Sequence, residues 1–343
     1  MLETEVVVSP SPHLRSGVNT EGIMWMVVLA LVPASIAAVY FFGWPTLKLL
    51  FASMGAAVLT EALCELFMKR PLTITDGSAV VTGLLLALTL PPTVPVWLPA
   101  VGAAFAIIFG KQVYGGLGYN PFNPALIGRA FLLASWPSLM MNWVWPEGSL
   151  GWAESATTLS GATAAATGAT AGATAGATVQ TVDAIASATP LALWRGGITD
   201  IPYLQLYLGN IAGSLGETSA LAILLGGLFL LVYKLIDWRI PCSYLGTVAL
   251  FAFLLGEDPL FHLLAGGLLF GAFFMATDYV TTPVTPLGRL FFGIGCGLLT
   301  ILIRKFGGFP EGVCYSILIM NTTTPLLDRW TVPKRFGEVK ANG

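Results

Sequence analysis

The chain has 343 residues, of which 55% are hydrophobic and only 10% are charged, and its mean hydropathy is +0.79. A soluble domain carries about 25% charged residues, so this composition excludes a soluble globular protein. It also excludes disordered, collagenous and disulfide-rich classes. The formal net charge is −2 and the sequence has no basic cluster, so nucleic acid is not expected as a partner. The sequence therefore predicts a polytopic membrane protein surrounded by a lipid bilayer.

Apolar stretches that can enter or cross a bilayer recur along the chain and predict an all-α fold with about ten transmembrane helices. The expected spans are residues 22–42, 46–68, 78–93, 96–113, 124–143, 217–236, 241–256, 260–277, 287–303 and 311–327. Some of them are short or interrupted by Gly and Pro, notably after Asp76 and around Pro241. Such segments often line a cavity in which irregular backbone is tolerated.

The spans divide the chain into a segment of residues 1–21, a membrane half of residues 22–143, a loop of residues 144–205, a second half of residues 206–327 and a tail of residues 328–343. Two motifs recur in the second half: Thr75-Asp76 as Thr277-Asp278, and Asn120-x-x-x-Pro124 as Asn321-x-x-x-Pro325. They suggest two related halves of about five helices each. A different register pairs Gly128-Arg129 with Gly288-Arg289, and the pattern does not choose between an inverted and a parallel repeat.

The basic residues predict the orientation of the chain in the membrane. If the N- and C-termini are cytoplasmic, twelve of the sixteen Lys and Arg residues lie on the cytoplasmic side, as the positive-inside rule requires. The other four are Lys48, Arg195, Arg304 and Lys305, and the adjacent pair Arg304-Lys305 fits this orientation badly. The long loop is then expected outside the cytoplasm.

Low-complexity sequence occupies the middle of this loop. Residues 155–178 read SATTLSGATAAATGATAGATAGAT, which consists almost entirely of Ala, Thr, Gly and Ser. A stretch of this kind can bury little surface, so its composition predicts a flexible tether.

A Gly- and Pro-rich segment follows Lys111 at the end of an expected span. It reads GGLGYNPFNP over residues 115–124 and contains Asn120 and Asn123. Each Asn side chain offers donors and an acceptor, which suits the polar edge of a flat heterocycle such as an isoalloxazine. The alternative is a tight loop in which the two Asn side chains cap helix ends.

Four acidic residues stand near apolar segments, where an ionisable side chain is a functional candidate. Glu61 and Glu65 are four residues apart on one helix face, and they belong either to an ion path or to the headgroup region beside Lys69-Arg70. Asp76 and Asp278 are the other two. Asp76 either caps the helix that follows it or contributes to a cation or flavin site.

The Cys and His residues predict no metal site. Cys64, Cys242, Cys296 and Cys314 occur in apolar surroundings without a CxxC motif, and the two histidines are His13 and His262. A zinc or iron–sulfur site needs about four clustered ligands, so the cysteines are interpreted as reduced packing residues.

Asp183-x-x-x-x-x-Thr189 lies near the end of the long loop. It resembles the recognition motif of flavin transferases, D-x-x-[S/T]-G-A-T, which attach FMN to the Thr hydroxyl by a phosphodiester. Ala186 and Ser187 depart from that motif. Of the loop's Ala-Thr sites, Thr189 has an acidic residue six positions before it, whereas Thr163 and the later Gly-Ala-Thr triplets do not. Thr189 is therefore the expected acceptor.

Taken together, these motifs resemble the family of membrane proteins that contains the D subunit of the Rnf complex and the B subunit of the Na+-translocating NADH:quinone reductase. The resemblance rests on Ser11-Pro12-His13, Thr75-Asp76-Gly77-Ser78, the segment of residues 115–124, Ala188-Thr189-Pro190-Leu191 and Ala276-Thr277-Asp278. It covers nearly the whole chain outside the Ala/Gly/Thr insert. The short N-terminal segment favours the Rnf type over the quinone reductase type.

The resemblance implies an electron carrier in a complex that couples electron transfer between NADH and ferredoxin to Na+ or H+ movement. It implies covalent FMN on Thr189, with Asp183 read by a flavin transferase, and a second flavin, riboflavin, held without a covalent bond. Lys111, Asn120 and Asn123 are the candidates for the second flavin. The implied partners are other Rnf subunits: one with covalent FMN, further membrane subunits and iron–sulfur subunits. The implied location is the bacterial inner membrane, with the long loop periplasmic.

The competing interpretation is a channel or solute transporter of the urea or ammonium type, because ten spans in two halves with interrupted segments would suit one. Such pores are expected to show paired intramembrane His or an ordered polar filter, and His262 has no second His in the apolar segments. The equivalent protein of a Na+-translocating NADH:quinone reductase is a further alternative.

Overall fold

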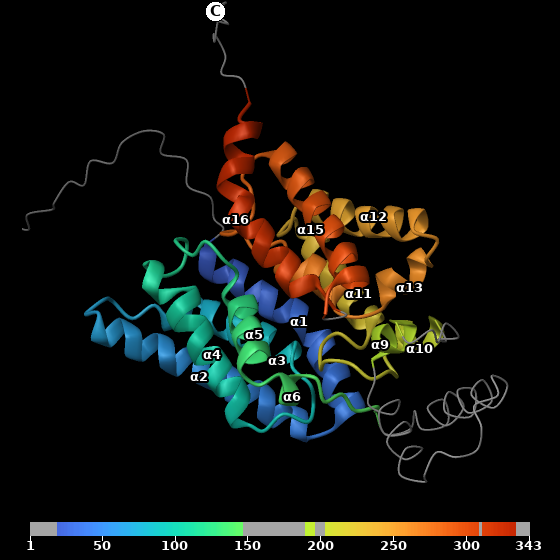
Figure 1. Ribbon diagram of the computed structural model, residues 1–343. Helices are drawn as coiled ribbons and strands as arrows, with labels where there is room; N and C mark the ends of the chain where they lie inside the picture. Colours follow the sequence, from blue (N-terminus) through green and yellow to red (C-terminus); the bar gives the residue numbers. More distant parts are fainter. Residues whose placement is uncertain (1–18, 147–188, 196–202, 309–310, 334–343) are drawn as a thin grey trace, which may run out of the picture.

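A computed structural model describes residues 19–146, 189–195, 203–308 and 311–333. Every regular element in these residues is a helix, and Figure 1 shows them gathered in one helical assembly. The expected all-α polytopic class is therefore confirmed. Asp183, the Ala/Gly/Thr insert and most of both termini lie outside the described residues, and the division into two related halves stays a prediction.

The blue and green part of the chain in Figure 1 forms the lower group of helices. Its longest members are α1 and α2, which are joined by a short connection; α2 packs mainly against α3 and α4, and α1 packs against α11 of the later part. The elements are α1 Thr20–Phe42, α2 Pro45–Phe67, η1 Ile74–Asp76, α3 Ser78–Leu88, α4 Trp97–Gly110, η2 Gln112–Tyr114, α5 Pro124–Ser135 and α6 Pro137–Met140.

The later part of the chain supplies the upper group in Figure 1, in which α12, α15 and α16 pack together. The short helices α9 and α10 lie at its edge. The elements are α9 Pro190–Arg195, α10 Tyr203–Leu208, α11 Ala220–Val232, α12 Arg239–Leu254, α13 Pro259–Leu264, α14 Leu268–Phe270, the π-helix η3 Gly271–Met275, α15 Pro286–Phe306 and α16 Val313–Thr331.

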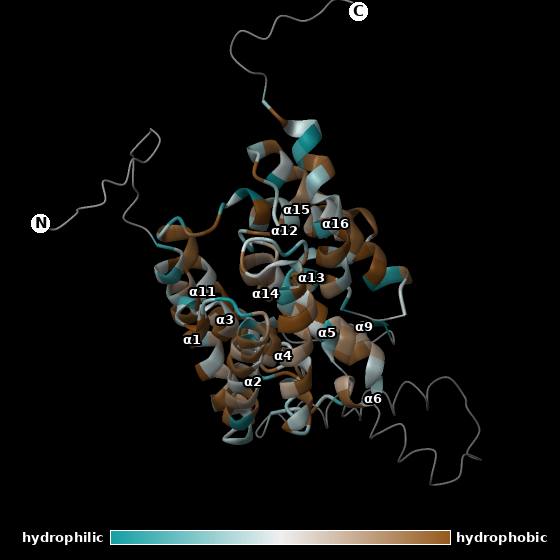
Figure 2. Ribbon diagram, turned by 90° about the vertical axis from the view of Figure 1, so that its left-hand side faces the viewer, coloured by the Kyte–Doolittle hydropathy of each residue, from teal (hydrophilic) through white to brown (hydrophobic). Residues whose placement is uncertain are grey.

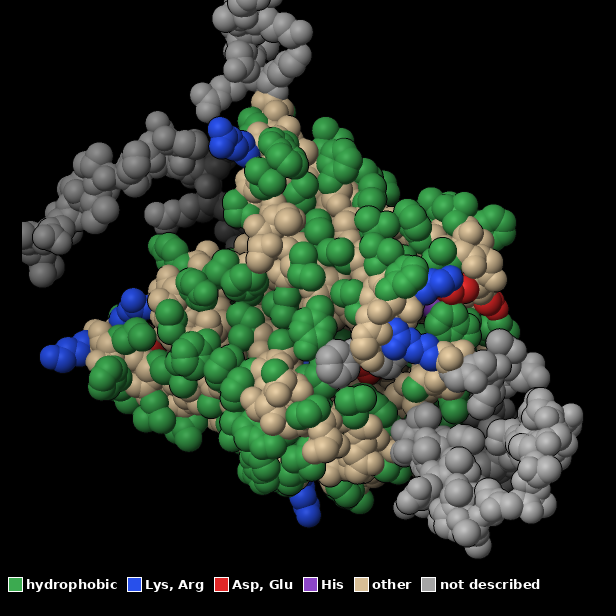
Figure 3. Space-filling view, viewed as in Figure 1, with side chains coloured by type: hydrophobic (Ala, Val, Ile, Leu, Met, Phe, Trp, Pro, Cys, Tyr) green, Lys and Arg blue, Asp and Glu red, His purple; other side chains and the backbone are tan. Residues whose placement is uncertain are grey.

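Helix lengths and surface side chains agree with a protein that sits in a bilayer. Among the described residues, four helical stretches are long and apolar enough to cross a membrane: Thr20–Phe42, Pro45–Phe67, Trp97–Tyr114 and Pro286–Phe306. Figure 2 shows apolar residues along nearly all helices, and hydrophobic side chains cover most of the face in Figure 3. On that face, charged side chains gather mainly on the right, over α9 and α13.

Three expected spans are shorter or more broken than the sequence suggested. The span expected over residues 78–93 ends as a helix at Leu88, and nine of the residues of α3 are buried. The span expected over residues 124–143 is divided into α5 and α6, because Pro137 begins a new helix. The span expected over residues 260–277 is interrupted between α13 and α14, where Gly266 has a φ of 68°. This last region, residues 259–280, is called the broken segment below; residues 259–265 are called its outer end and residues 273–280 its inner end, as names for positions in the segment.

The ends of these interrupted helices find their hydrogen-bond partners inside the protein. The carbonyl groups of Leu88 and Leu90, beyond which α3 does not continue, accept from the backbone N–H groups of Gly216 and Leu215 at 2.7 and 3.0 Å. A hydrocarbon environment supplies no such partners, so a half-helix is stable only where another part of the chain provides them. The buried loop before α11 serves this purpose for α3.

Glycines allow the helices to approach closely. A Cβ atom at Gly83 in α3 would lie 2.8 Å from the carbonyl oxygen of Ser53 in α2, and the Ser53 hydroxyl donates to the Gly83 carbonyl at 2.7 Å. A Cβ atom at Gly226 in α11 would overlap the carbonyl oxygen of Ala30 in α1. Small residues at helix crossings are the usual way in which membrane helices pack.

We therefore expect Gly226→Ala to push α1 and α11 apart and to destabilise the protein by about 1–3 kcal/mol, the usual cost of overpacking. Gly55→Ala is the matched control, because nothing lies within 4 Å of a Cβ atom at that position in α2. The measurement is thermal unfolding of the purified protein in detergent, in which only Gly226→Ala should lower the midpoint. Equal midpoints for the two variants would contradict the close crossing.

Candidate functional site

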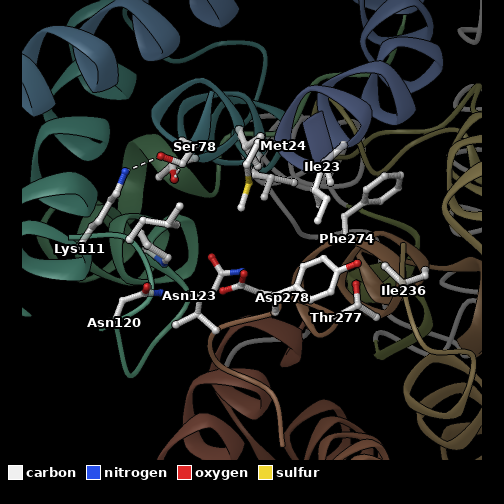
Figure 4. A pocket seen from close by; sticks show the side chains of 18 of the residues that line it. Ile23, Met24, Ser78, Lys111, Asn120, Asn123, Ile236, Phe274, Thr277 and Asp278 are labelled. Carbon is white, nitrogen blue, oxygen red and sulfur yellow. Dashed lines mark hydrogen bonds between the residues drawn. The ribbon is translucent and has the colours of Figure 1, made fainter. Parts of the chain in front are cut away.

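A pocket opens where the two groups of helices meet (Figure 4). It encloses about 730 Å3 including its open mouth. Its lining comes from the start of α1, the start of α3, the segment between α4 and α5, the end of α11 and the inner end of the broken segment. Lys111, Asn120 and Asn123, which the sequence singled out, all line it. The structure therefore brings these three candidates together.

The two Asn side chains differ in how much of their hydrogen-bonding capacity is free. The Asn123 side-chain oxygen accepts from the N–H groups of Ala125 and Leu126 at 3.0 and 3.4 Å, so Asn123 caps α5. Its amide nitrogen donates to the Met275 carbonyl at 3.2 Å, which joins α5 to the broken segment. Asn123 thus follows the capping interpretation.

Asn120 is also buried, and its amide nitrogen donates to the Phe122 carbonyl at 3.1 Å. Its side-chain oxygen has no hydrogen-bond partner among the described residues. A buried acceptor without a partner costs free energy, so this oxygen is suited to a ligand that carries an N–H donor. Asn120 therefore meets the requirement for a ligand-binding group better than Asn123 does.

Lys111 lies beside the pocket in a chain of polar contacts, and Figure 4 shows its contact with Ser78. Its ammonium group donates to the Glu61 carboxylate and to the Ser78 hydroxyl, and the Ser78 hydroxyl donates to Asp76 at 2.6 Å. Lys111 and Glu61 are 2% and 0% exposed, so both charges are removed from solvent. A pair at this depth needs both partners, because either charge alone would be strongly unfavourable.

The other acidic candidates have separate positions. Glu65 accepts from the backbone N–H of Thr73 at 2.9 Å, so it binds the loop after α2 rather than the pocket. Asp76 accepts from the Ser78 N–H at 2.8 Å at the start of α3, in agreement with its capping interpretation. Asp278 lines the pocket at the inner end of the broken segment.

Thr189 immediately precedes α9, in a different region of the molecule. Its side chain is 7% exposed, and its hydroxyl accepts from the Ala192 N–H at 3.3 Å. The Trp194 ring of the same helix contacts the His262 ring of α13 edge to face, with the ring centres 4.8 Å apart. The outer end of the broken segment therefore packs against the helix that follows Thr189.

Buried charges surround this outer region, and the sequence interpretation did not identify them as a group. Arg129 of α5 donates to Glu217 at 3.0 Å and also pairs with Glu311. The Glu217 carboxylate lies against Gly267, where a Cβ atom would collide with it. The signal was present in the sequence, because Arg129 stands inside an apolar stretch where a charge is costly.

Arg304 and Lys305, the pair that fitted the orientation badly, also belong here. The Arg304 guanidinium donates to the carbonyls of His262 and Ala265 at 2.6 and 3.0 Å, so it satisfies the end of α13. Lys305 pairs with Glu257 at 2.9 Å. These cations have partners within the protein, as Lys111 and Arg129 of the cytoplasmic twelve also do, so none of the four reports on orientation as a loop charge does.

The start of α13 is held from a neighbouring helix. The Asp258 side chain accepts from the Leu260 N–H at 2.9 Å and from the Tyr203 hydroxyl of α10. The hydrogen bond from Tyr203 holds the pKa of Asp258 below its usual value. The broken segment is thus fixed near Thr189 at one end and lines the pocket at the other.

Comparison with known proteins identifies the family of the chain. Residues 7–337 match the NQR2, RnfD, RnfE family. The chain is 44% identical to the D subunit of the Na(+)-translocating ferredoxin:NAD(+) oxidoreductase complex of Acetobacterium woodii, covering 99% of this chain and 98% of the relative. It is 43% identical to the D subunit of the proton-translocating ferredoxin:NAD(+) oxidoreductase complex of Clostridium ljungdahlii, covering 96% of each. The D subunit of the ion-translocating oxidoreductase complex of Escherichia coli O127:H6 is 40% identical over 97% of this chain and 99% of the relative. The chain therefore belongs to the NQR2, RnfD, RnfE family.

Proposed function

We propose that this protein is the D subunit of an Rnf-type complex that couples electron transfer between NADH and ferredoxin to cation movement. The main support is a sequence identity of 40–44%, over nearly the full length, to proteins named as D subunits of such complexes. It would work with a partner that carries covalent FMN, other membrane subunits and iron–sulfur subunits in the bacterial inner membrane. Family membership favours this function over a urea or ammonium channel.

We propose Na+ or H+ as the transported cation. One relative is named Na+-translocating and another proton-translocating, at 44% and 43% identity.

The pocket suits a non-covalent flavin such as riboflavin, which would supply one- and two-electron redox chemistry when bound. The Asn120 oxygen would accept from the ring imide N–H, which gives this orphaned acceptor a partner. The Lys111 ammonium would lie near the polar edge of the ring, while Leu117 and Phe274 in the lining would exclude water. The backbone at Gly115, Gly116 and Gly118 has positive φ, so this loop requires glycine.

Thr189 is the proposed anchor of a tethered cofactor because, among the loop's Ala-Thr sites, it has an acidic residue six positions before it, and it immediately precedes α9. Covalent FMN attached there would remain close to the broken segment and could not diffuse away. Asp183, outside the described residues, would be read by the flavin transferase. The chain would then hold one flavin near each end of the broken segment.

If Thr189 carries FMN, Thr189→Val expressed together with the flavin transferase should lose the fluorescent band in a denaturing gel. Thr178→Val, in a Gly-Ala-Thr triplet without an acidic residue six positions earlier, is the matched control and should keep the band. Thr189→Ser retains the hydroxyl and the cap, and it distinguishes a lost acceptor from a misfolded α9. A band that persists in Thr189→Val would refute the assignment.

For the second flavin, Asn120→Leu should weaken binding roughly 5- to 150-fold, the equivalent of about 1–3 kcal/mol for an unpaired polar group. Acid extraction should then release much less flavin than from the wild type, whereas the covalent band remains. Asn120→Asp keeps an acceptor and should retain more flavin than Asn120→Leu. Full extractable flavin in Asn120→Leu would place the second flavin elsewhere.

The proposed location also fixes the orientation of the chain. Because Lys and Arg resist translocation, an alkaline phosphatase fused after Gly168 should be active, and one fused after Lys340 should be inactive. The opposite pattern would place Thr189 on the cytoplasmic side and contradict an outer-face FMN.

A further inference from the structure

Lys111 lies between the buried Glu61 carboxylate and the pocket, where its charge can balance a negative charge on either side. Its ammonium group contacts Glu61 on one side and Ser78 on the other, and both Lys111 and Ser78 line the pocket. Glu61 lies behind Lys111 in α2 and is not part of the lining. Lysine has a flexible four-carbon stem, so its ammonium group can exchange one partner for another without backbone movement.

Without Lys111, the Glu61 carboxylate would have few hydrogen-bond partners for its charge. One carboxylate oxygen accepts from Lys111 and, at 3.3 Å, from the Gln112 amide. The other oxygen is buried and has no hydrogen-bond partner among the described residues. If Lys111 turned away, a completely buried carboxylate would keep only one weak donor, which is strongly unfavourable unless the charge is neutralised.

We propose that Lys111 couples the charge in the pocket to proton uptake at Glu61. This inference rests on the proposed flavin in the pocket. One electron that enters the pocket brings one negative charge, and the Lys111 ammonium group turns from Glu61 toward that charge. Glu61 then takes one proton from the aqueous phase on its unpartnered oxygen. When the electron leaves, Lys111 returns and Glu61 releases the proton, so the net charge of the buried region is the same in both states.

The surroundings favour Glu61 over its acidic neighbours as the group that takes up the proton. The titratable groups near it are Lys111 after α4, Cys64 and Glu65 on its own helix α2, and Asp76 in η1. Glu65 is bound by the Thr73 N–H and hydroxyl, and Asp76 by the Ser78 N–H and hydroxyl, whether or not Lys111 moves. Glu61 alone among these acids has Lys111 as its ionic partner in the described part of the chain.

Infrared difference spectroscopy between the oxidised and reduced purified complex tests this proposal. Reduction should produce the C=O stretching band of a protonated carboxylic acid. Glu61→Gln should lose the contribution of Glu61 to that band because it has no carboxyl group. Lys111→Gln should lose it as well, because Glu61 without its partner is protonated in both states. Glu65→Gln, one turn further along α2, is the matched control and should keep the band.

Extractable flavin is measured first in each variant, which separates this proposal from the proposed function. A wild-type complex without extractable flavin would contradict the flavin pocket itself. A variant without flavin is replaced by Glu61→Asp, which keeps the charge and should shift the frequency of the band, or by Lys111→Arg, which keeps the charge and should keep the band. With flavin present, a band unchanged in Glu61→Gln, or lost equally in Glu65→Gln, would overturn the role of Glu61. A Na+-dependent shift of a carboxylate band in place of the protonated band would overturn proton uptake.

Discussion

Polar groups inside a bilayer must find their partners within the protein, and this requirement shapes every irregular part of the fold. The carbonyl groups at the end of half-helix α3 accept from the N–H groups of residues 215 and 216. The carbonyl groups at the end of α13 accept from the Arg304 guanidinium. Asn123 both caps α5 and holds the carbonyl of Met275. The partners of α3 and of Asn123 come from the later part of the chain, so these two contacts also tie the two groups of helices together.

The broken segment, whose polar groups also find partners within the protein, connects the two sites of the proposed function. Its outer end packs on α9, which Thr189 precedes, and its inner end lines the pocket beside Asn120. The Glu217 carboxylate, which is paired with Arg129, lies against its middle at Gly267. Contacts at both ends and in the middle suit a segment that would hold the two proposed redox sites apart.

Much of this organisation could be predicted from the sequence, because apolar stretches, the Gly-rich loop and the Thr189 motif are local patterns. The sequence also indicated that Lys111, Asn120 and Asn123 belong together, since they lie within one short segment. It could not reveal partners such as Glu61 and Lys111, which are 50 residues apart, or Arg129 and Glu217, which are 88 apart. It also could not show that Asn123 uses its polar atoms internally whereas Asn120 keeps a free acceptor.

A cryo-electron microscopy map of the purified complex is the most direct test of the central claim, that this chain holds one redox group near each end of the broken segment. The account predicts continuous density from the Thr189 oxygen to a bound FMN. It also predicts a flat ring in the pocket, with its polar edge toward Asn120. A bare Thr189 together with a pocket filled by lipid or by the protein's own side chains would contradict it.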